Sequence, residues 1–417
     1  MKDNCDLVHL INMFSFRFNI TTVIFRFILL LYWLLYLPFR AFIIRRKKVI
    51  KVVFVLSDLG KWKTESLYIA MRNHNRFEPI LLVCPYVSTG NSGLYVLINY
   101  LKEKNYYYLQ LDRKQMISDV IKADIIFYQE SYKGIIDSNK EYKRNLGSLF
   151  CYVAYGFHWL NNTWNINQPF KNFCWQVYCE NELAMKDVAS FMTNKAQNCI
   201  ITGLPMTDIF VQPISHFKDP WKGQNKRKFR IIWAPHYTIS VGPAFCYSTF
   251  LTYCDYMLCI AEKYQDSIQI AFKPHPVLLT KLYEIWGKEK TDYYYARWRD
   301  GNNTQLESGE YVGLFMYSDA MIHDCGTFTV EYHYTRKPVL YLLNGDDHYK
   351  DLNEFGRMAF DLHYKGRCEE DIEAFINNVI EGKDDMKEVR EKFYNDYLLP
   401  PDGNSASDNI IKAILGE

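Results

Sequence analysis

The sequence predicts an α/β protein of two doubly wound domains, and three observations predict that fold. Short apolar runs alternate with amphipathic segments along most of the 417 residues, which is typical of the strands and helices of parallel sheets. The alternation stops at a polar, basic stretch, residues 216–228, and restarts behind it with a new apolar run. A hydrophobic content of 49% lets a chain of this length bury two separate cores.

The first domain is expected over residues 49–215. Its opening run, VIKVVFVL at 49–56, is almost continuously apolar and predicts a strand buried on both faces of a sheet. Further strands are expected at 79–84, 106–111, 124–128, 150–154, 175–179 and 199–202, and helices at 62–73, 94–104, 114–122 and 181–192.

Residues 216–228 are expected to be a linker, 229–400 the second domain and 401–417 a C-terminal tail. Two successive arrays of this kind predict two domains that face each other across a cleft. The second-domain strands are expected at 229–233, 267–272, 320–322 and 339–343, and its helices at 247–263, 277–286, 292–299, 327–335, 369–381 and 385–397.

Residues 1–48 are predicted to associate with a membrane. An apolar block at 18–39 is interrupted only by Arg26 and is followed by the basic run RRKK at 45–48. About 20 apolar residues span a bilayer, and an off-centre arginine can snorkel. The basic run predicts that the rest of the chain lies at the cytoplasmic face of the cell membrane. A buried helix of the fold is the alternative.

Charge and cysteine usage exclude several classes of function. A net charge of +2 gives no basic field for nucleic acid. The 11 cysteines include no C-x-x-C pair and no zinc spacing, so reduced thiols and no metal site are predicted. Asp346 and Asp347 offer carboxylates to a divalent ion, but a solvated turn is favoured. No dinucleotide fingerprint or Walker loop is present, and no cofactor is assigned.

The turn after the predicted strand at 320–322 is a candidate phosphate site. It contains Asp324, Cys325, Gly326 and Thr327, with Glu331 one helical turn further along. Free N–H groups at a helix start favour an anion, glycine lets the backbone approach it closely, and threonine adds a hydroxyl. An ordinary turn capped by Asp324 or Thr327 is the alternative.

Three histidines follow predicted strands: His158, His236 and His275. Histidine is suited to proton transfer near neutral pH. Lys273 precedes His275 in the turn KPHP, whose two prolines fix the backbone and preorganise both side chains for an anion. The alternative is a structural role for each histidine. Glu130 follows the strand at 124–128 and is expected to be a solvated loop carboxylate.

Three motifs in order resemble the CDP-glycerol glycerophosphotransferases of wall teichoic acid synthesis and their relatives in surface-polymer assembly. GLPMTD at 203–208 resembles G-x-P-R-x-D, and KPHP at 273–276 resembles R/K-P-H-P. HDCGT at 323–327, a downstream acid and RKP at 336–338 resemble T-D-Y-S-S, an acid and K-K-P. The resemblance covers about residues 150–343 and implies a two-domain GT-B fold, with 49–215 as the Rossmann-like acceptor domain and 229–400 as the Rossmann-like nucleotide-donor domain.

The resemblance also implies roles for individual residues. His275 and the turn at Gly326 and Thr327 would hold the pyrophosphate of a CDP-linked donor, and Glu331 would meet the ribose. The double serine of the family is Gly-Thr here, and YGFH at 155–158 stands at the place of a His-Gly-Thr motif. His158, or else His236, is therefore the expected base.

Three functions are carried forward. The first is transfer of a polyol phosphate from a CDP-linked donor to a hydroxyl of a lipid-linked or glycan acceptor at the inner membrane surface, with release of CMP. A GT-B glycosyltransferase that uses a nucleotide sugar is the second, and a non-catalytic scaffold is the third. Mg²⁺ and the oligomeric state are left open.

Overall fold

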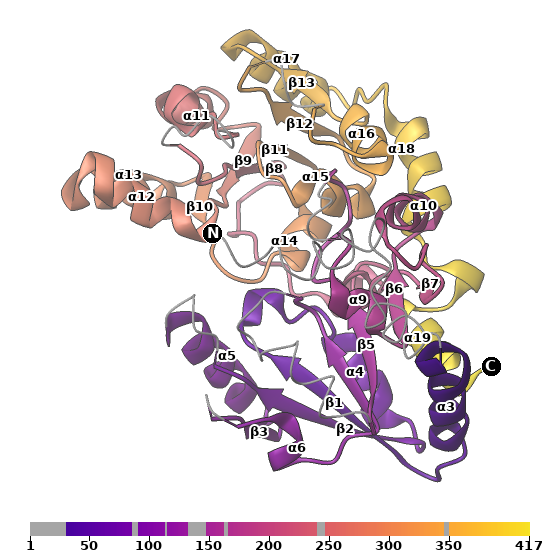
Figure 1. Cartoon of the computed structure of the whole chain (residues 1–417). Helices are drawn as coiled ribbons and strands as arrows, with labels where there is room; N and C mark the ends of the chain where they lie inside the picture. Colours follow the sequence, from indigo (N-terminus) through magenta and orange to yellow (C-terminus); the bar gives the residue numbers. More distant parts are fainter. Residues whose placement is uncertain are drawn as a thin grey trace, which may run out of the picture. The chain divides into compact units, whose positions relative to one another are not determined.

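The computed structural model describes residues 31–85, 91–112, 115–131, 147–161, 166–239, 247–345 and 350–417. The chain divides into two compact units, each with one parallel sheet and flanking helices (Figure 1). The predicted fold class is confirmed. Unit 1 contains Met1–Gly156, Asn162–Asp208 and Pro400–Glu417, and unit 2 contains Phe157–Asn161 and Ile209–Leu399.

Unit 1 is built on a seven-stranded sheet with the order β3-β2-β1-β4-β5-β6-β7. The direction of strand addition reverses between β1 and β4, which are parallel neighbours. Every residue of β1 except Lys51 is buried, as expected for a strand covered on both faces. The strands are β1 Ile50–Leu56, β2 Phe77–Val83, β3 Tyr108–Gln110, β4 Ile125–Tyr128, β5 Leu149–Val153, β6 Gln176–Cys179 and β7 Cys199–Ile201.

Helices flank this sheet, and short 3-10 turns follow two of its strands. The α-helices described are α4 Glu65–Asn73, α5 Asn91–Glu103, α6 Ile117–Val120, α9 Pro169–Phe173, α10 Glu182–Phe191 and α19 Ala406–Leu415. The 3-10 turns are η2 Leu59–Lys61, which follows β1, η3 Pro205–Thr207, which follows β7, and η7 Pro401–Gly403.

The described part of the N-terminal segment packs on unit 1 through one side only. A π-helical turn, η1 Tyr32–Tyr36, continues into α3 Leu37–Arg45, in which Leu37, Ala41 and Ile44 are buried. The Arg45 side chain donates to the carbonyls of Ala413 and Ile414. Among the described residues, no helix has both the length and the apolar character needed to cross a bilayer. Residues 1–30 lie outside the described ranges.

Residues 401–417, expected from the sequence to be a separate C-terminal tail, belong to unit 1. The carboxylate of Asp208 accepts hydrogen bonds from the N–H groups of Ala406 (2.7 Å) and Ser407 (3.1 Å) and from the Ser407 hydroxyl (2.5 Å). Gly203 has a φ of +78°, and a Cβ there would lie 3.1 Å from Pro400 and Ala406. The motif at 203–208 therefore anchors the returning chain.

Unit 2 contains a six-stranded sheet with the order β10-β9-β8-β11-β12-β13, and the direction of strand addition reverses between β8 and β11. The strands are β8 Phe229–Ala234, β9 Ile268–Phe272, β10 Thr304–Leu306, β11 Ala320–His323, β12 Val339–Leu342 and β13 Tyr364–Gly366. Aromatic rings fill much of the core, with Trp233 5.0 Å from Phe272 and 5.3 Å from Trp298 between ring centroids.

The unit 2 helices follow the predicted alternation, and the helix expected at 327–335 is one α-turn followed by a 3-10 segment. The α-helices are α11 Phe250–Lys263, α12 Pro276–Trp286, α13 Lys288–Asp300, α14 Val312–Tyr317, α15 Phe328–Glu331, α16 Glu354–Asp361, α17 Glu369–Ile380 and α18 Lys387–Phe393. The other turns are η4 Ile214–His216, η5 Tyr332–Thr335 and η6 Tyr394–Leu398.

Candidate functional site

Most of the predicted site residues meet at one edge of the unit 2 sheet. β9, β8 and β11 are consecutive parallel neighbours, so their carboxyl ends lie together. His236 follows β8, Lys273 and His275 follow β9, and the turn at 324–327 follows β11. This edge is also the point where the strand order reverses, which is the usual ligand site of open α/β sheets.

Asp324 ties this edge together. One carboxylate oxygen accepts the N–H of His236 (2.5 Å), and the other accepts the N–H (2.6 Å) and the hydroxyl (2.9 Å) of Thr249, just before α11. Asp324 is 1% exposed, and burial raises its pKa to about 6 although these hydrogen bonds lower it. Its contacts therefore fit a positioning role better than the direct phosphate contact expected from the sequence, because a buried carboxylate repels phosphate.

His236 and His275 lie side by side, with ring centroids 5.1 Å apart and the Tyr237 ring 4.4 Å from each. Nδ1 of His275 accepts the N–H of Val277 (3.2 Å) and so caps α12. The proton of the neutral imidazole must then sit on Nε2. His275 thus offers an N–H donor on the side of the ring away from its helix.

Burial keeps both imidazoles neutral. It lowers the pKa of His236 to about 4, with a smaller contribution from His275, and it lowers the pKa of His275 to about 4, with a smaller contribution from Lys273. Lys273 is 7% exposed, and burial lowers its pKa as well. Within the described residues its ammonium forms no ion pair, so it is available to an anionic ligand.

The turn at Gly326 explains the departure from the double serine. A Cβ at Gly326 would lie 3.0 Å from the Trp159 indole, so the ring occupies the space that a serine side chain needs. Thr327 is exposed and precedes α15. Cys325 is buried, and its N–H donates to Nδ1 of His323 (3.1 Å). Cys325 therefore contributes backbone and packing here rather than an exposed thiol.

Glu331 and His158 are also placed in unit 2. Glu331 is 3% exposed and accepts a hydrogen bond from the Tyr311 hydroxyl (2.5 Å), so its contact with a ribose remains a prediction. His158 was assigned to the first domain from the sequence, but Phe157–Asn161 is counted with unit 2. The carbonyl of His158 accepts from the Asn353 side chain (2.8 Å), and its neighbour Trp159 contacts Gly326.

Three buried histidines, His323, His333 and His363, form a cluster next to the turn at 324–327. The sequence did not reveal them as a cluster. Nδ1 of His363 donates to the Ala359 carbonyl (3.0 Å), so Nε2 of this neutral imidazole is an acceptor. Nε2 of His323 therefore donates to Nε2 of His363 (3.1 Å). Nε2 of His333 also donates to the Ala359 carbonyl (2.9 Å). Burial lowers the pKa of His323 and His333 to about 3 and that of His363 well below its usual value. These side chains are neutral structural groups.

Metal ligation has no support among the described residues, which contain no group of three His, Cys, Asp or Glu side chains arranged to hold a metal ion. Asp346 and Asp347, considered as carboxylates for a divalent ion, lie outside the described ranges.

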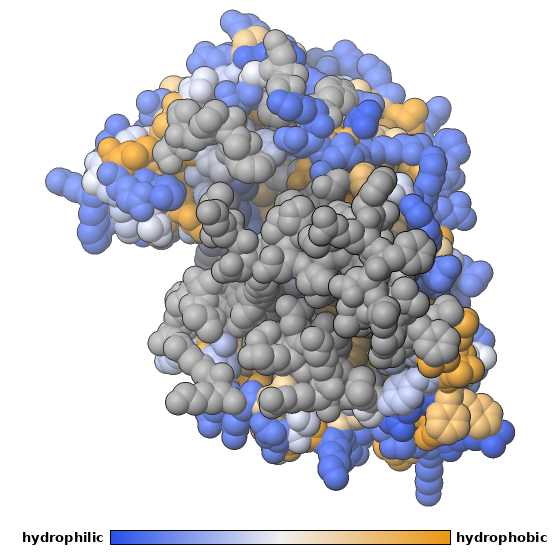
Figure 2. Space-filling view, in the orientation of Figure 1, coloured by the Kyte–Doolittle hydropathy of each residue, from blue (hydrophilic) through white to orange (hydrophobic). Residues whose placement is uncertain are grey.

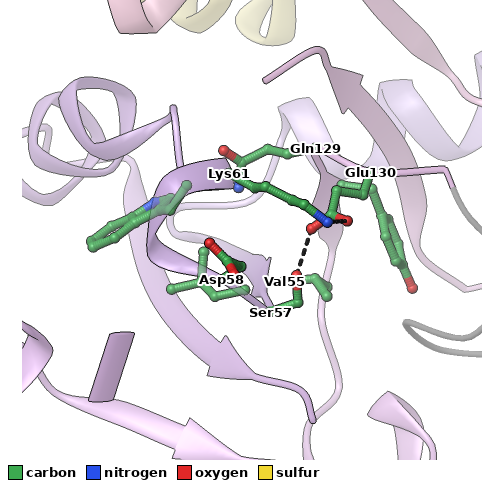
Figure 3. A pocket seen from close by; sticks show the side chains of 9 residues that line it. Val55, Ser57, Asp58, Lys61, Gln129 and Glu130 are labelled. Atoms are coloured by element: carbon green, nitrogen blue, oxygen red, sulfur yellow. Dashed lines mark hydrogen bonds and ion pairs between the residues drawn. The ribbon is translucent and has the colours of Figure 1, made fainter. Parts of the chain in front are cut away.

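A second cluster in unit 1 corrects the expectation for Glu130. This carboxylate is 6% exposed rather than solvated. It accepts a hydrogen bond from the Ser57 hydroxyl (2.5 Å) and forms an ion pair with Lys61 (2.6 Å) at the edge of a pocket (Figure 3). The sequence could not show this pairing, because Lys61 lies 69 residues before its partner.

Two doubly wound units, one with a lysine and neutral histidines where its strand order reverses, define a protein of the GT-B fold type. The family model of CDP-glycerol:poly(glycerophosphate) glycerophosphotransferase matches residues 165–416, more than half of the chain. The protein belongs to this family, and the predicted resemblance and the prediction of a transferase are confirmed.

Solved structures share the fold at low sequence identity. A UDP-GlcNAc 2-epimerase from Neisseria meningitidis bound to UDP-GlcNAc aligns with a TM-score of 0.56 and 14% identity, covering 88% of this chain and 100% of that one. The wall teichoic acid polymerase TagF aligns with a TM-score of 0.55 and 12% identity, covering 89% and 90%. No curated protein matches the sequence.

Proposed function

We propose that the protein transfers a polyol phosphate, with glycerol phosphate as the first candidate, from a CDP-linked donor to a hydroxyl of a lipid-linked or glycan acceptor. The observation that carries this proposal is the grouping of Lys273, His236 and His275 at the switch point of unit 2. Their chemistry suits the diphosphate of a nucleotide, and family membership supplies the donor class.

The donor side of the reaction is mainly charge neutralisation and alignment. The Lys273 ammonium and the Nε2–H of His275 bind the diphosphate oxygens, and Thr327 adds a hydroxyl and backbone N–H groups next to Gly326. Glu331 accepts from a ribose hydroxyl. Asp324 keeps His236 in place through its backbone N–H.

In the transfer step, the acceptor oxygen attacks the β-phosphorus and forms a new P–O bond. The bond from that phosphorus to the bridging oxygen breaks, and CMP leaves with the electron pair. The proton of the attacking hydroxyl passes to a neutral histidine. His158 is our first choice because its neighbour Trp159 contacts the turn at Gly326, and His236 is the second.

His275→Ala tests the donor site. Because the imidazole supplies a diphosphate donor, this variant should lose at least about a hundredfold in transfer, on the scale of one lost electrostatic donor. It should also lose the thermal stabilisation that CDP gives the wild type. Wild-type turnover in a folded His275→Ala variant would contradict the assignment.

A nucleotide sugar is the second candidate donor. Gly326 stands where the resembled motif has a serine, and the Trp159 ring lies against this position. The site next to the donor phosphate therefore lacks one hydroxyl group. Hydrolysis or transfer with UDP- or GDP-sugars in place of CDP-polyols would favour this alternative.

We also propose that the protein works at the cytoplasmic face of the membrane. The side of η1 and α3 opposite the buried residues carries large exposed apolar side chains, which form part of the orange patch at the lower right of Figure 2. Two basic residues, Arg46 and Lys48, are exposed just after α3. The exposed apolar residues are Leu31, Leu34, Leu35, Phe39 and Phe42. Such a surface suits anionic lipid.

A further inference from the structure

The segment Phe157–Asn161 is bound to the rest of unit 2 through its backbone. Leu160 forms an antiparallel bridge with Leu352. The backbone N–H of Asn161 donates to the carbonyl of Asp351 (2.8 Å), and its side-chain amide donates to the carbonyl of Leu352 (2.9 Å). Pairing of this kind satisfies backbone groups and fixes the path of the segment.

Asn353 joins this segment to helix α16. It is 2% exposed, and its Oδ1 accepts the N–H of Gly356 (2.8 Å), which caps the helix. Its Nδ2 donates to the carbonyl of His158 (2.8 Å), and its backbone N–H donates to the carbonyl of Trp159 (3.2 Å). A flipped amide would set donor against donor at Gly356 and acceptor against acceptor at His158, so the orientation of the Asn353 side chain is fixed.

Gly356 is the second point of attachment. A Cβ at this position would lie 2.0 Å from the carbonyl oxygen of Trp159 and 3.0 Å from its carbonyl carbon. No side chain fits there unless the segment moves. Glycine destabilises a helix interior relative to alanine. Its presence in the first turn of α16 therefore serves the close approach of the segment.

These contacts place the segment beside the candidate donor site. The indole of Trp159 reaches the turn at Gly326, where a Cβ would lie 3.0 Å from the ring. On the other side of His158, the ring of Phe157 lies 6.2 Å from that of Phe355 on α16, measured between centroids. His158 thus stands between two residues that are packed on unit 2.

We propose that Asn353 is a positioning residue for the transfer step and holds His158 on the unit that binds the donor. The inference rests on the proposed function, in which His158 takes the proton of the acceptor hydroxyl. A base must lie within hydrogen-bond reach of that proton, and a displacement of about 1 Å can cost a hundredfold in rate. Lys273 and His275 follow β9, so donor binding should not depend on Asn353.

Asn353→Asp separates the capping of α16 from the contact with His158. Aspartate keeps an oxygen that caps the helix, but it loses the Nδ2–H donor and sets a charged oxygen against the His158 carbonyl. The kcat of transfer should fall by at least about tenfold, while the KM for the CDP-linked donor and the melting temperature stay unchanged. Asn181→Asp, the same substitution at the N-cap of α10, is the matched control and should keep the wild-type kcat.

Gly356→Ala tests the same attachment without a change of charge, also where Asn353→Asp does not fold. The new methyl group must push the Trp159 carbonyl away, so kcat should fall by about a hundredfold. Amide hydrogen exchange at Asn161 should become faster, because its hydrogen bond to Asp351 opens more often. Gly223→Ala, where a Cβ meets no heavy atom within 4 Å, is the control. Wild-type exchange and kcat in Gly356→Ala would overturn the inference.

A double-mutant cycle with His158→Ala distinguishes positioning from a structural effect. In that background Asn353→Asp should lower kcat no further, because its effect passes through the missing imidazole. Additive losses, or a wild-type kcat in either single variant, would overturn the inference. CDP binding should fail in His275→Ala and persist in Asn353→Asp. Failure of the donor assignment and failure of this inference are therefore distinguishable.

Discussion

Gly326 stands where the motif that this turn resembles has a serine, and its surroundings predict what a serine there would do. The new side chain would meet the Trp159 ring at about the 3.0 Å distance of a Cβ, so the ring must move. We expect Gly326→Ser to lower the free energy of unfolding by about 1–2 kcal/mol. Chemical denaturation measures this value.

The matched control for that substitution is Gly223→Ser, because a Cβ at Gly223 has no heavy atom within 4 Å. In a Trp159→Ala background, Gly326→Ser should cost little, since the obstructing ring is gone. Equal stability of Gly326→Ser and Gly223→Ser would contradict the conclusion that the Trp159 ring obstructs a side chain at position 326.

The buried histidines predict a pH dependence of stability. The pKa of His333 is lowered to about 3 by burial, below the value of about 6.5 in an unfolded chain. The unfolded state therefore binds the proton first, and stability is lost as the pH falls from about 6.5 toward 3. Gln keeps an Nε2–H donor for the Ala359 carbonyl but does not titrate.

Between pH 7 and pH 5, the free energy of unfolding should fall by about 1–2 kcal/mol less in His333→Gln than in the wild type. Denaturant titrations at the two pH values give this difference. His216→Gln, the same change at an exposed position, is the control and should follow the wild type. Identical pH dependence in His333→Gln and wild type would contradict the neutral state of the cluster.

At the scale of elements, the exposed side of η1 and α3 predicts binding to anionic vesicles. Leu35 and Phe39 are 63% and 60% exposed, so replacing both with Ser should leave stability within about 0.5 kcal/mol. Vesicle affinity should fall by about tenfold or more, because each apolar side chain gains from leaving water. Added salt should weaken wild-type binding.

Co-sedimentation with vesicles measures this affinity. Tyr107→Ser is the matched control, because Tyr107 is an exposed aromatic residue elsewhere in unit 1, 73% exposed. A wild type that stays in solution, or a double variant that sediments like it, would argue against membrane attachment through this side.

Each strand predicted from the sequence is present, because most of these strands are buried on both faces and so carry an apolar pattern that is visible locally. The strands β10 and β13 were missed, because their sequences, TQL and YKG, do not form apolar runs. Glu130 was misjudged because the partner that lets its carboxylate be buried, Lys61, is remote in sequence. The histidine cluster of His323, His333 and His363 was invisible for the same reason.

At the scale of the whole molecule, the sequence located the change between the two arrays but not the path of the chain. Phe157–Asn161 is counted with unit 2 and Pro400–Glu417 with unit 1, and crossings of this kind have no local signature. For the site, strand exits and the three motifs predicted the edge that holds His236, Lys273 and His275. The positioning contacts of Asp324 and the packing of Trp159 needed the folded structure.

The proposed function requires that unit 2 bind a CDP-linked polyol for transfer. The most direct measurement follows nucleotide release from CDP-glycerol, CDP-ribitol and a set of UDP- and GDP-sugars, with lipid-linked acceptors from bacterial membranes. We expect release of CMP from a CDP-polyol, and this release should require the acceptor and be lost in His275→Ala. Release of UDP or GDP from a nucleotide sugar, with no CMP from either CDP-polyol, would contradict it.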